Sequence, residues 1–149
     1  MRYFLDTEFD GFGGPLISVG LAAEQGDDYY VVIPLEQEPT DWVARHVIPY
    51  LRSVPTELYN RLDPIAAAHD IAAYLATDPD PEIVADWPED IALFCRLLLI
   101  GDGEIVDVSS LRFRFLRTPG FSTAANSRVP HNALHDARAL RNFVLESEG

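Results

Sequence analysis

The sequence predicts a single α/β domain, because strand-like and helix-like segments alternate along it without a repeat, low-complexity tract or linker. Its 149 residues are 48% hydrophobic and 23% charged, which is the composition of a globular protein. A chain of this length buries roughly 70% of the surface that its unfolded form exposes. One hydrophobic core is therefore enough to hold the fold.

The first third of the chain predicts three strands joined by short turns. Residues 2–9 alternate and are rich in aromatic side chains, residues 16–23 form an apolar run, and residues 29–34 give a third strand. Glycine-rich and acidic turns separate them, at residues 10–15 and 25–28. We expect an antiparallel meander.

The middle third changes to helical periodicity. Thr40 or Asp41 can cap a helix that ends near Pro49. A second helix is predicted over residues 65–76, with an apolar side that consists of Ile65, Ala68, Ala72 and Leu75.

Strands and helices alternate again in the last part of the chain. We predict a buried strand over residues 81–86, a helix over 88–99, a fifth strand over 104–108, an irregular loop over 109–129 and a final helix over 132–146.

The charge is strongly negative, with 24 acidic residues, 11 basic residues that are all arginine, and a net charge of −13. Such a surface repels phosphate at long range, so a protein that coats nucleic acid non-specifically is not expected. An enzyme that handles the end of a strand through bound cations remains compatible with this charge.

The only cysteine is Cys95, so no disulfide can form within the chain. Its apolar neighbours predict a buried thiol in a reducing compartment. No signal peptide or membrane-spanning stretch is expected, and we predict a cytoplasmic protein.

Two carboxylates share one side of the first predicted strand. Asp6 and Glu8 are two residues apart, about 7 Å along the strand, and point to the same face. This arrangement offers a cation two convergent oxygen ligands, although an exposed strand end would also explain it.

The predicted C-terminal helix begins with a second group of polar residues. Asn132 is expected to cap it, which puts Asp136 about one turn into the helix and leaves His131 in the preceding loop. Asp136 is either part of the site or a surface residue that the helix dipole stabilises. His135 is expected at the surface.

A third group lies where the predicted strand 81–86 passes into a helix. Asp86, Glu89 and Asp90 compete for one role there, and Glu89 is interpreted as an ordinary acidic residue of the first helical turn.

Taken in order, Asp6-Thr7-Glu8, Asp90, and His131 five residues before Asp136 resemble the motifs of the DEDDh 3′ to 5′ exonuclease superfamily. The resemblance covers residues 1–149. The related Tyr subclass would place tyrosine at position 132, which is Asn here. The family's second motif usually has Asn where this chain has Asp86, so the choice between Asp90 and Asp86 stays open.

A closer similarity is to the RNase AS-like branch of small exoribonucleases that prefer adenylate tracts. The segments that carry it are residues 2–9, 16–20, 29–31 and 42–49. The resemblance implies an RNase H-like mixed five-stranded sheet with helices on both faces, and a homodimer.

The resemblance also implies a two-metal mechanism. Asp6, Glu8 and Asp136 would hold one Mg²⁺ or Mn²⁺, and Asp6 would bridge to a second ion, on which Asp90 acts. His131 would accept a proton from the attacking water. The expected product is a nucleoside 5′-monophosphate.

Substrate contacts are expected from aromatic residues, from a glycine and from arginines. Phe9, ahead of Phe12 and Trp87, is the first candidate for stacking on a base, and the backbone at Gly11 can approach a nucleotide closely. Arg112 and Arg128 are the selected candidates for phosphate contacts, with Arg114 and Arg117 behind them. Trp42 is predicted in the core or a dimer interface.

Three functions follow from these observations. The single-stranded RNA 3′ exonuclease comes first, a single-stranded DNA 3′ to 5′ exonuclease second, and an inactive nucleic-acid-binding or interaction module third. Since all five motif residues are present, the third is disfavoured.

Overall fold

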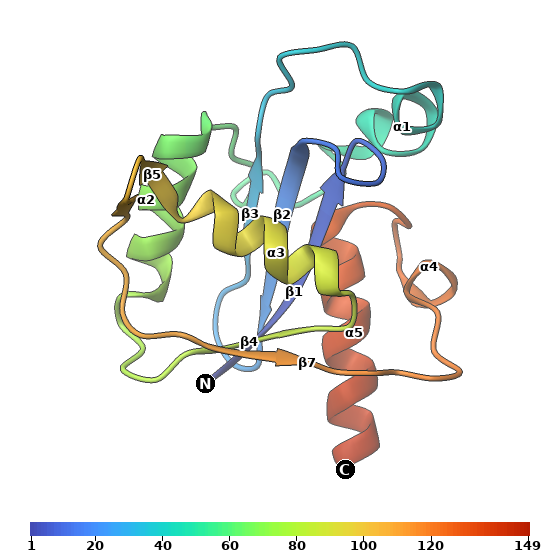
Figure 1. Ribbon diagram of the computed structural model, residues 1–149. Coiled ribbons are helices and arrows are strands. Elements are labelled where there is room, and N and C mark those ends of the chain that lie inside the picture. Colours follow the sequence, from blue (N-terminus) through green and yellow to red (C-terminus); the bar gives the residue numbers. More distant parts are fainter.

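The computed structural model describes residues 1–149 and places five strands in one mixed sheet (Figure 1). The strand order is β3-β2-β1-β4-β7. The strands are β1 (Arg2–Phe9), β2 (Leu16–Ala23), β3 (Tyr29–Val32), β4 (Glu82–Ala85) and β7 (Arg112–Phe115). The first three form the expected antiparallel meander, and β4 and β7 continue the sheet in parallel.

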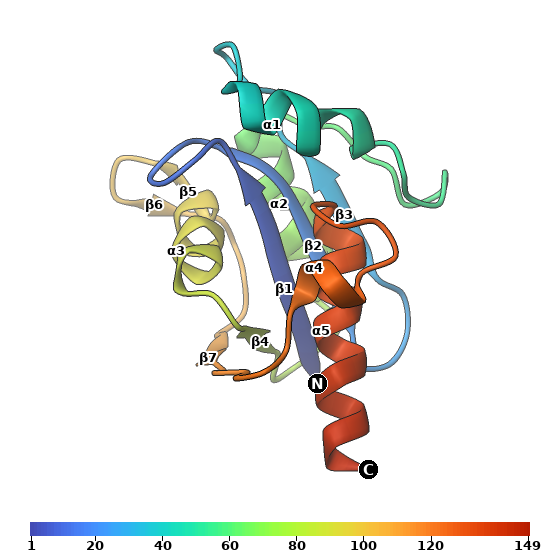
Figure 2. The same cartoon turned by 90° about the vertical axis from the view of Figure 1, so that its right-hand side faces the viewer.

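Helices cover both faces of this sheet, as Figure 2 shows with α5 on one side and α3 on the other. The helices are α1 (Asp41–His46), the short 3-10 helix η1 (Ile48–Tyr50), α2 (Pro64–Leu75), α3 (Pro88–Leu97), α4 (Thr123–Asn126) and α5 (Ala133–Glu148). The prediction of an α/β domain with a mixed five-stranded sheet is confirmed, and the arrangement is compatible with an RNase H-like fold.

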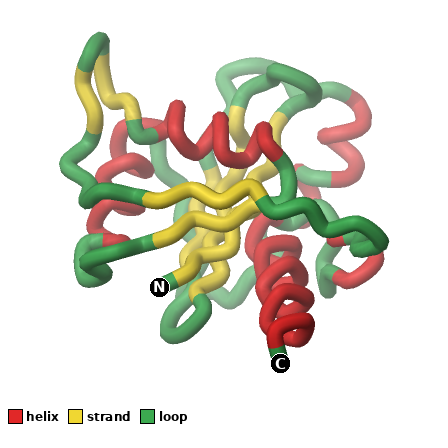
Figure 3. The backbone as a smooth tube through the Cα atoms, turned by 60° about the horizontal axis from the view of Figure 1, so that its bottom comes forward, coloured by secondary structure: helices red, strands yellow, loops and turns green.

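Each face of the sheet has its own hydrophobic contact with the helices, and the twisted strands lie between them in Figure 3. On one face, Phe4 and Val84 pack against Ala137, Leu140 and Val144 of α5. On the other face, the larger core cluster joins the sheet to α2 and α3. The C-terminal helix therefore packs on the sheet through one apolar side.

The fifth strand lies elsewhere than predicted. Residues Glu104–Ile105 form only the short β6, which pairs with β5 (Leu99–Gly101) in a separate two-stranded sheet. The fifth strand of the main sheet is instead β7, which lies next to β4 at one edge. It falls within residues 109–129, which we expected to form a loop. All four side chains of β7 are exposed, so no apolar run revealed it.

Two predictions of burial are wrong. Cys95 is exposed, because the buried side of α3 consists of Asp90, Phe94 and Leu97. Ile65 is 53% exposed, since α2 turns a neighbouring stripe, which includes Ala67 and Ile71, toward the core.

None of the helices has both the length and the apolar character that a membrane span requires.

The start of α5 lies directly on β2, and Gly20 makes this contact possible. A Cβ atom at Gly20 would lie 2.4 Å from the Ala133 carbonyl oxygen. Gly20 is also the partner of Asp6 in the β1–β2 register. The absence of a side chain at Gly20 therefore lets α5 pack closely on β2, next to the position of Asp6 on β1.

We expect Gly20→Ala to lower the free energy of unfolding by about 1–3 kcal/mol, because overpacking a rigid backbone contact has that cost. Urea denaturation measures it. The matched control is Gly101→Ala, whose Cβ would meet only the Glu104 side chain at 3.2 Å. Equal stability of the two variants would contradict the close-approach argument.

Candidate active site

The two carboxylates of β1 face α5. Because side chains alternate along a strand, Asp6 and Glu8 share the face on which Phe4 packs against α5. The Oδ2 atom of Asp6 is buried and has no hydrogen-bond partner. The prediction that both carboxylates share one face is confirmed, and their end of the strand is not simply exposed.

The first turn of α5 adds a third carboxylate. Asp136 is only 6% exposed, and its Oδ1 atom also lacks a hydrogen-bond partner. The backbone N–H of His131 donates to Asp136 Oδ2 at 3.2 Å. Ligand atoms of Glu8, His131 and Asp136 all lie within 4.8 Å of one another. Three of the five expected site residues thus form one group.

His131 reaches this group through an unusual backbone conformation. It is the only non-glycine residue with a positive φ, of 67°. Asn132 follows as the N-cap, and its Oδ1 accepts from the N–H groups of Leu134 and His135. The Nδ2 group of the same residue donates to the Tyr50 carbonyl oxygen at 2.9 Å. Asn132 therefore fixes the loop that carries His131 against η1.

Asp90 approaches the group from the other face of the sheet. It is 3% exposed and accepts a hydrogen bond of 2.6 Å from Thr7 Oγ1. Thr7 lies between Asp6 and Glu8 on β1, and its side chain points toward α3. Asp90 therefore lies outside the group that Glu8, His131 and Asp136 form, although its charge still raises the pKa of Asp6.

Asp86, the alternative to Asp90, has different partners. It accepts long hydrogen bonds of 3.5 Å from Thr118 and Thr123, in the segment that precedes α5. Besides burial, four nearby carboxylates raise the pKa of Asp6. The charge of Asp90 has the largest effect and the charge of Asp86 has the smallest.

Burial and mutual repulsion raise the pKa values of these carboxyl groups. Burial comes first for Glu8, and with the charge of Asp136 it raises the pKa to about 9. Burial, supported by nearby acidic residues, raises the pKa of Asp90 to about 7. Burial also raises the pKa values of Asp6 and Asp136. Without a cation, the group holds protons near neutral pH.

The residues present fit a divalent cation. Two buried carboxylate oxygens without partners, Asp6 Oδ2 and Asp136 Oδ1, lie on the two elements that meet at the site. Carboxylate oxygens are the preferred ligands of Mg²⁺ and Mn²⁺. A positive charge would also remove the repulsion that raises the pKa values.

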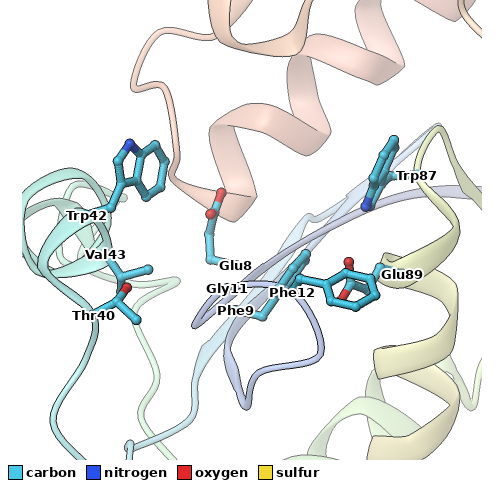
Figure 4. A pocket seen from close by; sticks show the side chains of 9 residues that line it. All are labelled: Glu8, Phe9, Gly11, Phe12, Thr40, Trp42, Val43, Trp87 and Glu89. Carbon is cyan, nitrogen blue, oxygen red and sulfur yellow. The ribbon is translucent and has the colours of Figure 1, made fainter.

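A cavity of about 450 Å³ opens beside Glu8, and most of its other walls are apolar (Figure 4). Phe9 at the end of β1 and Gly11 and Phe12 in the following turn line it, and Trp87 lines it from the N-cap of α3. Figure 4 places Trp42 across the cavity from Phe12 and Trp87, with Glu8 between them.

Trp42 was expected in the core or at a dimer interface. It is 52% exposed, and its ring lies 5.0 Å from the His131 ring and 4.7 Å from the His46 ring. The core assignment is therefore wrong, because α1 buries Val43 instead.

The two arginines selected for phosphate contacts lie in different places. Arg128 lines a cavity of about 490 Å³ together with His131. Arg112 lies at the start of β7 and forms ion pairs with Asp80 and Glu82. That end of β7 pairs with the beginning of β4, away from the carboxylates, so the structure does not bring Arg112 to the group.

Sequence reasoning missed Thr7, Gly20 and His46. Gly20 could have been noticed as the one residue without a side chain in the apolar run of β2. Thr7 could have been noticed as a polar residue on the inward face opposite Asp6 and Glu8. His46 gave no signal, because its position depends on how α1 folds over the site.

The chain is similar to two curated proteins. Over 83 residues the chain is 40% identical to proteins named 3′-5′ exoribonuclease from two strains of Mycobacterium tuberculosis, CDC 1551 / Oshkosh and ATCC 25618 / H37Rv. The match covers 52% of this chain and 48% of each relative, so the chain spans about half the length of the curated relatives it matches. No family model matches the chain.

We expect the metal-free protein to become less stable as pH rises. The native pKa values of Glu8 and Asp90, about 9 and about 7, exceed their ordinary values of 4.5 and 3.8. Between these limits the native state binds more protons than the unfolded state, so the free energy of unfolding falls with rising pH. Urea denaturation in a chelator measures it from about pH 5 to about pH 8.

Glu8→Gln should make this decline shallower, whereas Glu38→Gln, at an exposed loop position, should leave it unchanged. Added Mn²⁺ should raise stability most at the upper end of the pH range, because the ion replaces protons. A stability that rises with pH in the chelator would contradict the buried carboxylate group.

Proposed function

We propose that this chain is a metal-dependent 3′ to 5′ exoribonuclease of the DEDDh type, which releases nucleoside 5′-monophosphates from single-stranded RNA. The observation that carries the proposal is the convergence of Glu8, His131 and Asp136 within 4.8 Å, beside the unpartnered oxygen of Asp6. The names of the mycobacterial relatives support the same reaction.

The four carboxylates have separate roles in this proposal. Asp6, Glu8 and Asp136 would hold one divalent ion, and Asp90 would act with Asp6 on a second ion. When bound, two such ions polarise a phosphodiester and activate a water. Thr7 orients Asp90, since its hydroxyl occupies one carboxylate oxygen at 2.6 Å.

His131 accepts the proton of the attacking water in this scheme. A neutral imidazole is suited to this role near neutral pH. The backbone of His131 is anchored to Asp136, and the ring is flanked by Trp42. These contacts hold the imidazole over the carboxylates, where the scissile phosphate would lie.

The cavity beside Glu8 suits the terminal nucleotide. Its volume of about 450 Å³ is adequate for a nucleotide, and its aromatic walls can stack on a base. Phe9 and Gly11, the residues proposed from the sequence to contact a nucleotide, both line this cavity. The adenylate preference rests on the similarity to the RNase AS-like branch, which also implies a homodimer.

The direct test is the degradation of 5′-labelled A10, U10 and dA10 with Mg²⁺, with Mn²⁺ and with a chelator. We expect shortening from the 3′ end that needs the metal, with 5′-AMP as product and A10 degraded fastest. Faster loss of dA10 than of A10 would move the assignment to a DNA exonuclease. No metal-dependent shortening of any substrate would refute the proposal.

Asp136→Asn is the matched inactive control for this assay, because it keeps the side chain's shape and removes a ligand charge. Its turnover should fall by more than the roughly 100-fold that loss of an outer partner of a metal site causes. Removal of one repelling charge should leave the stability of the metal-free variant equal or higher. Full activity of this variant would discard the mechanism.

A second pair of variants separates Asp90 from Asp86. Asp90→Asn should reduce kcat by more than about 100-fold, which exceeds the loss that removal of an outer partner of a metal site causes. Asp86→Asn should stay within about tenfold of the parent, because the amide oxygen can still accept from Thr118 and Thr123. The reverse order of kcat values would transfer the role to Asp86.

A further inference from the structure

The two longest stretches of this acidic chain without an acidic residue contain most of its arginines. Residues 42–56 and 108–135 hold six of the 11 arginines and none of the 24 acidic residues. At the average density of the chain, these 43 residues would hold about seven carboxylates. The positive charge is therefore concentrated in two short parts of the sequence.

The fold brings these two segments together. Asn132 donates to the carbonyl oxygen of Tyr50, and His135 Nε2 lies 2.7 Å from the carbonyl oxygen of Ser53. The Trp42 ring contacts the His131 ring edge-on. The first segment thus packs against the last part of the second segment, residues 128–135, at the start of α5.

A cavity of about 490 Å³ lies at this junction, and every residue that lines it comes from one of the two segments. His46, Tyr50 and Ser53 come from the first segment, and Arg128 and His131 come from the second. His131 belongs also to the group with Glu8 and Asp136. His131 is therefore shared by this cavity and the candidate active site.

Arg128 is the charge that this cavity offers. Its side chain is exposed and takes part in no ion pair or hydrogen bond within the protein. By contrast, Arg2, Arg112, Arg138 and Arg141 are all paired with carboxylates. An unpaired guanidinium in a cavity without acidic residues is suited to a phosphate.

We propose that this cavity binds the phosphodiester backbone on the 5′ side of the scissile bond, with Arg128 contacting the first upstream phosphate. This inference rests on the proposed function, because it takes the Glu8–His131–Asp136 group as the cleavage point. The apolar cavity beside Glu8 then holds the terminal nucleotide. Elsewhere the acidic surface repels the strand, so the approach through the two segments is the favourable one.

The test compares a dinucleotide with a longer strand. The dinucleotide ApA has only the scissile phosphate, whereas A8 also has upstream phosphates. Arg128→Ala should raise KM for A8 by about fivefold, leave kcat unchanged and leave KM for ApA unchanged. The slope of the logarithm of the A8 association constant against the logarithm of the salt concentration should become shallower by about 0.7. This is the value for one lost phosphate contact on a single strand.

Arg128→Lys should recover part of the affinity, and the matched control is Arg96→Ala. Arg96 is an exposed arginine in the last turn of α3, outside both segments, so its loss should not change KM for A8. An unchanged KM for A8 in Arg128→Ala would overturn the proposal. An equal loss for ApA and A8 would also overturn it, since Arg128 would then act at the scissile phosphate.

Binding of fluorescein-labelled A8 in a chelator, measured by anisotropy, separates this inference from the proposed function. If the parent protein cleaves nothing but Arg128→Ala still weakens binding about fivefold, the phosphate subsite stands and the nuclease proposal falls. Labelled dA8 should show the same dependence on Arg128, because the contact is to phosphate. Equal binding by the parent and by Arg128→Ala would remove the subsite whatever the activity.

Discussion

The repulsion among buried carboxylates is the constraint on which the candidate site depends. β1 directs Asp6 and Glu8 toward α5, and α5 presents Asp136 to the same space. Burying several negative charges without cationic partners is costly, and none of the paired arginines contacts these groups. The elevated pKa values of Glu8 and Asp90 show how the metal-free protein responds, by keeping protons. The cost of this cluster without a cation points to a bound cation that relieves it.

The geometry of the cluster is set by residues that carry no charge. Gly20 lets α5 approach β2 directly opposite Asp6, and Asn132 ties the start of α5 to η1. The same Asn132 side chain therefore links the group at Glu8 to the surface that contains Arg128. The proposed cleavage point and the proposed path of the strand are held by one buried hydrogen-bonding residue, whose exposed fraction is 1%.

Much of this arrangement could be predicted from the sequence, because its strongest signals are local. The alternation of β1 gave the shared face of Asp6 and Glu8, and the Asn132 cap gave the start of α5. The segment of β7 was missed because an outer strand with exposed side chains has no apolar pattern, and its pairing with β4 is a long-range property. The prediction for Trp42 failed for the same reason, because its position beside His131 depends on how α1 packs and not on a local sequence pattern.

The distribution of charge was also visible in the sequence, but its meaning needed the fold. Arg112 and Arg128 belong to the same acid-free segment, and only the structure separates them. Arg112 is neutralised by Asp80 and Glu82 at the far end of the sheet, while Arg128 stays unpaired beside His131. Net charge alone therefore describes this protein poorly, because it does not distinguish a neutralised arginine from an unpaired one beside the site.

Calorimetric titration of the protein with Mn²⁺ near pH 7.5, in two buffers of different ionisation enthalpy, tests the central claim most directly. The account predicts binding with net release of protons, because the ion displaces protons held by Glu8 and its neighbours. Glu8→Gln should release fewer protons per ion bound. Binding without proton release, or no binding at millimolar Mn²⁺, would contradict the account.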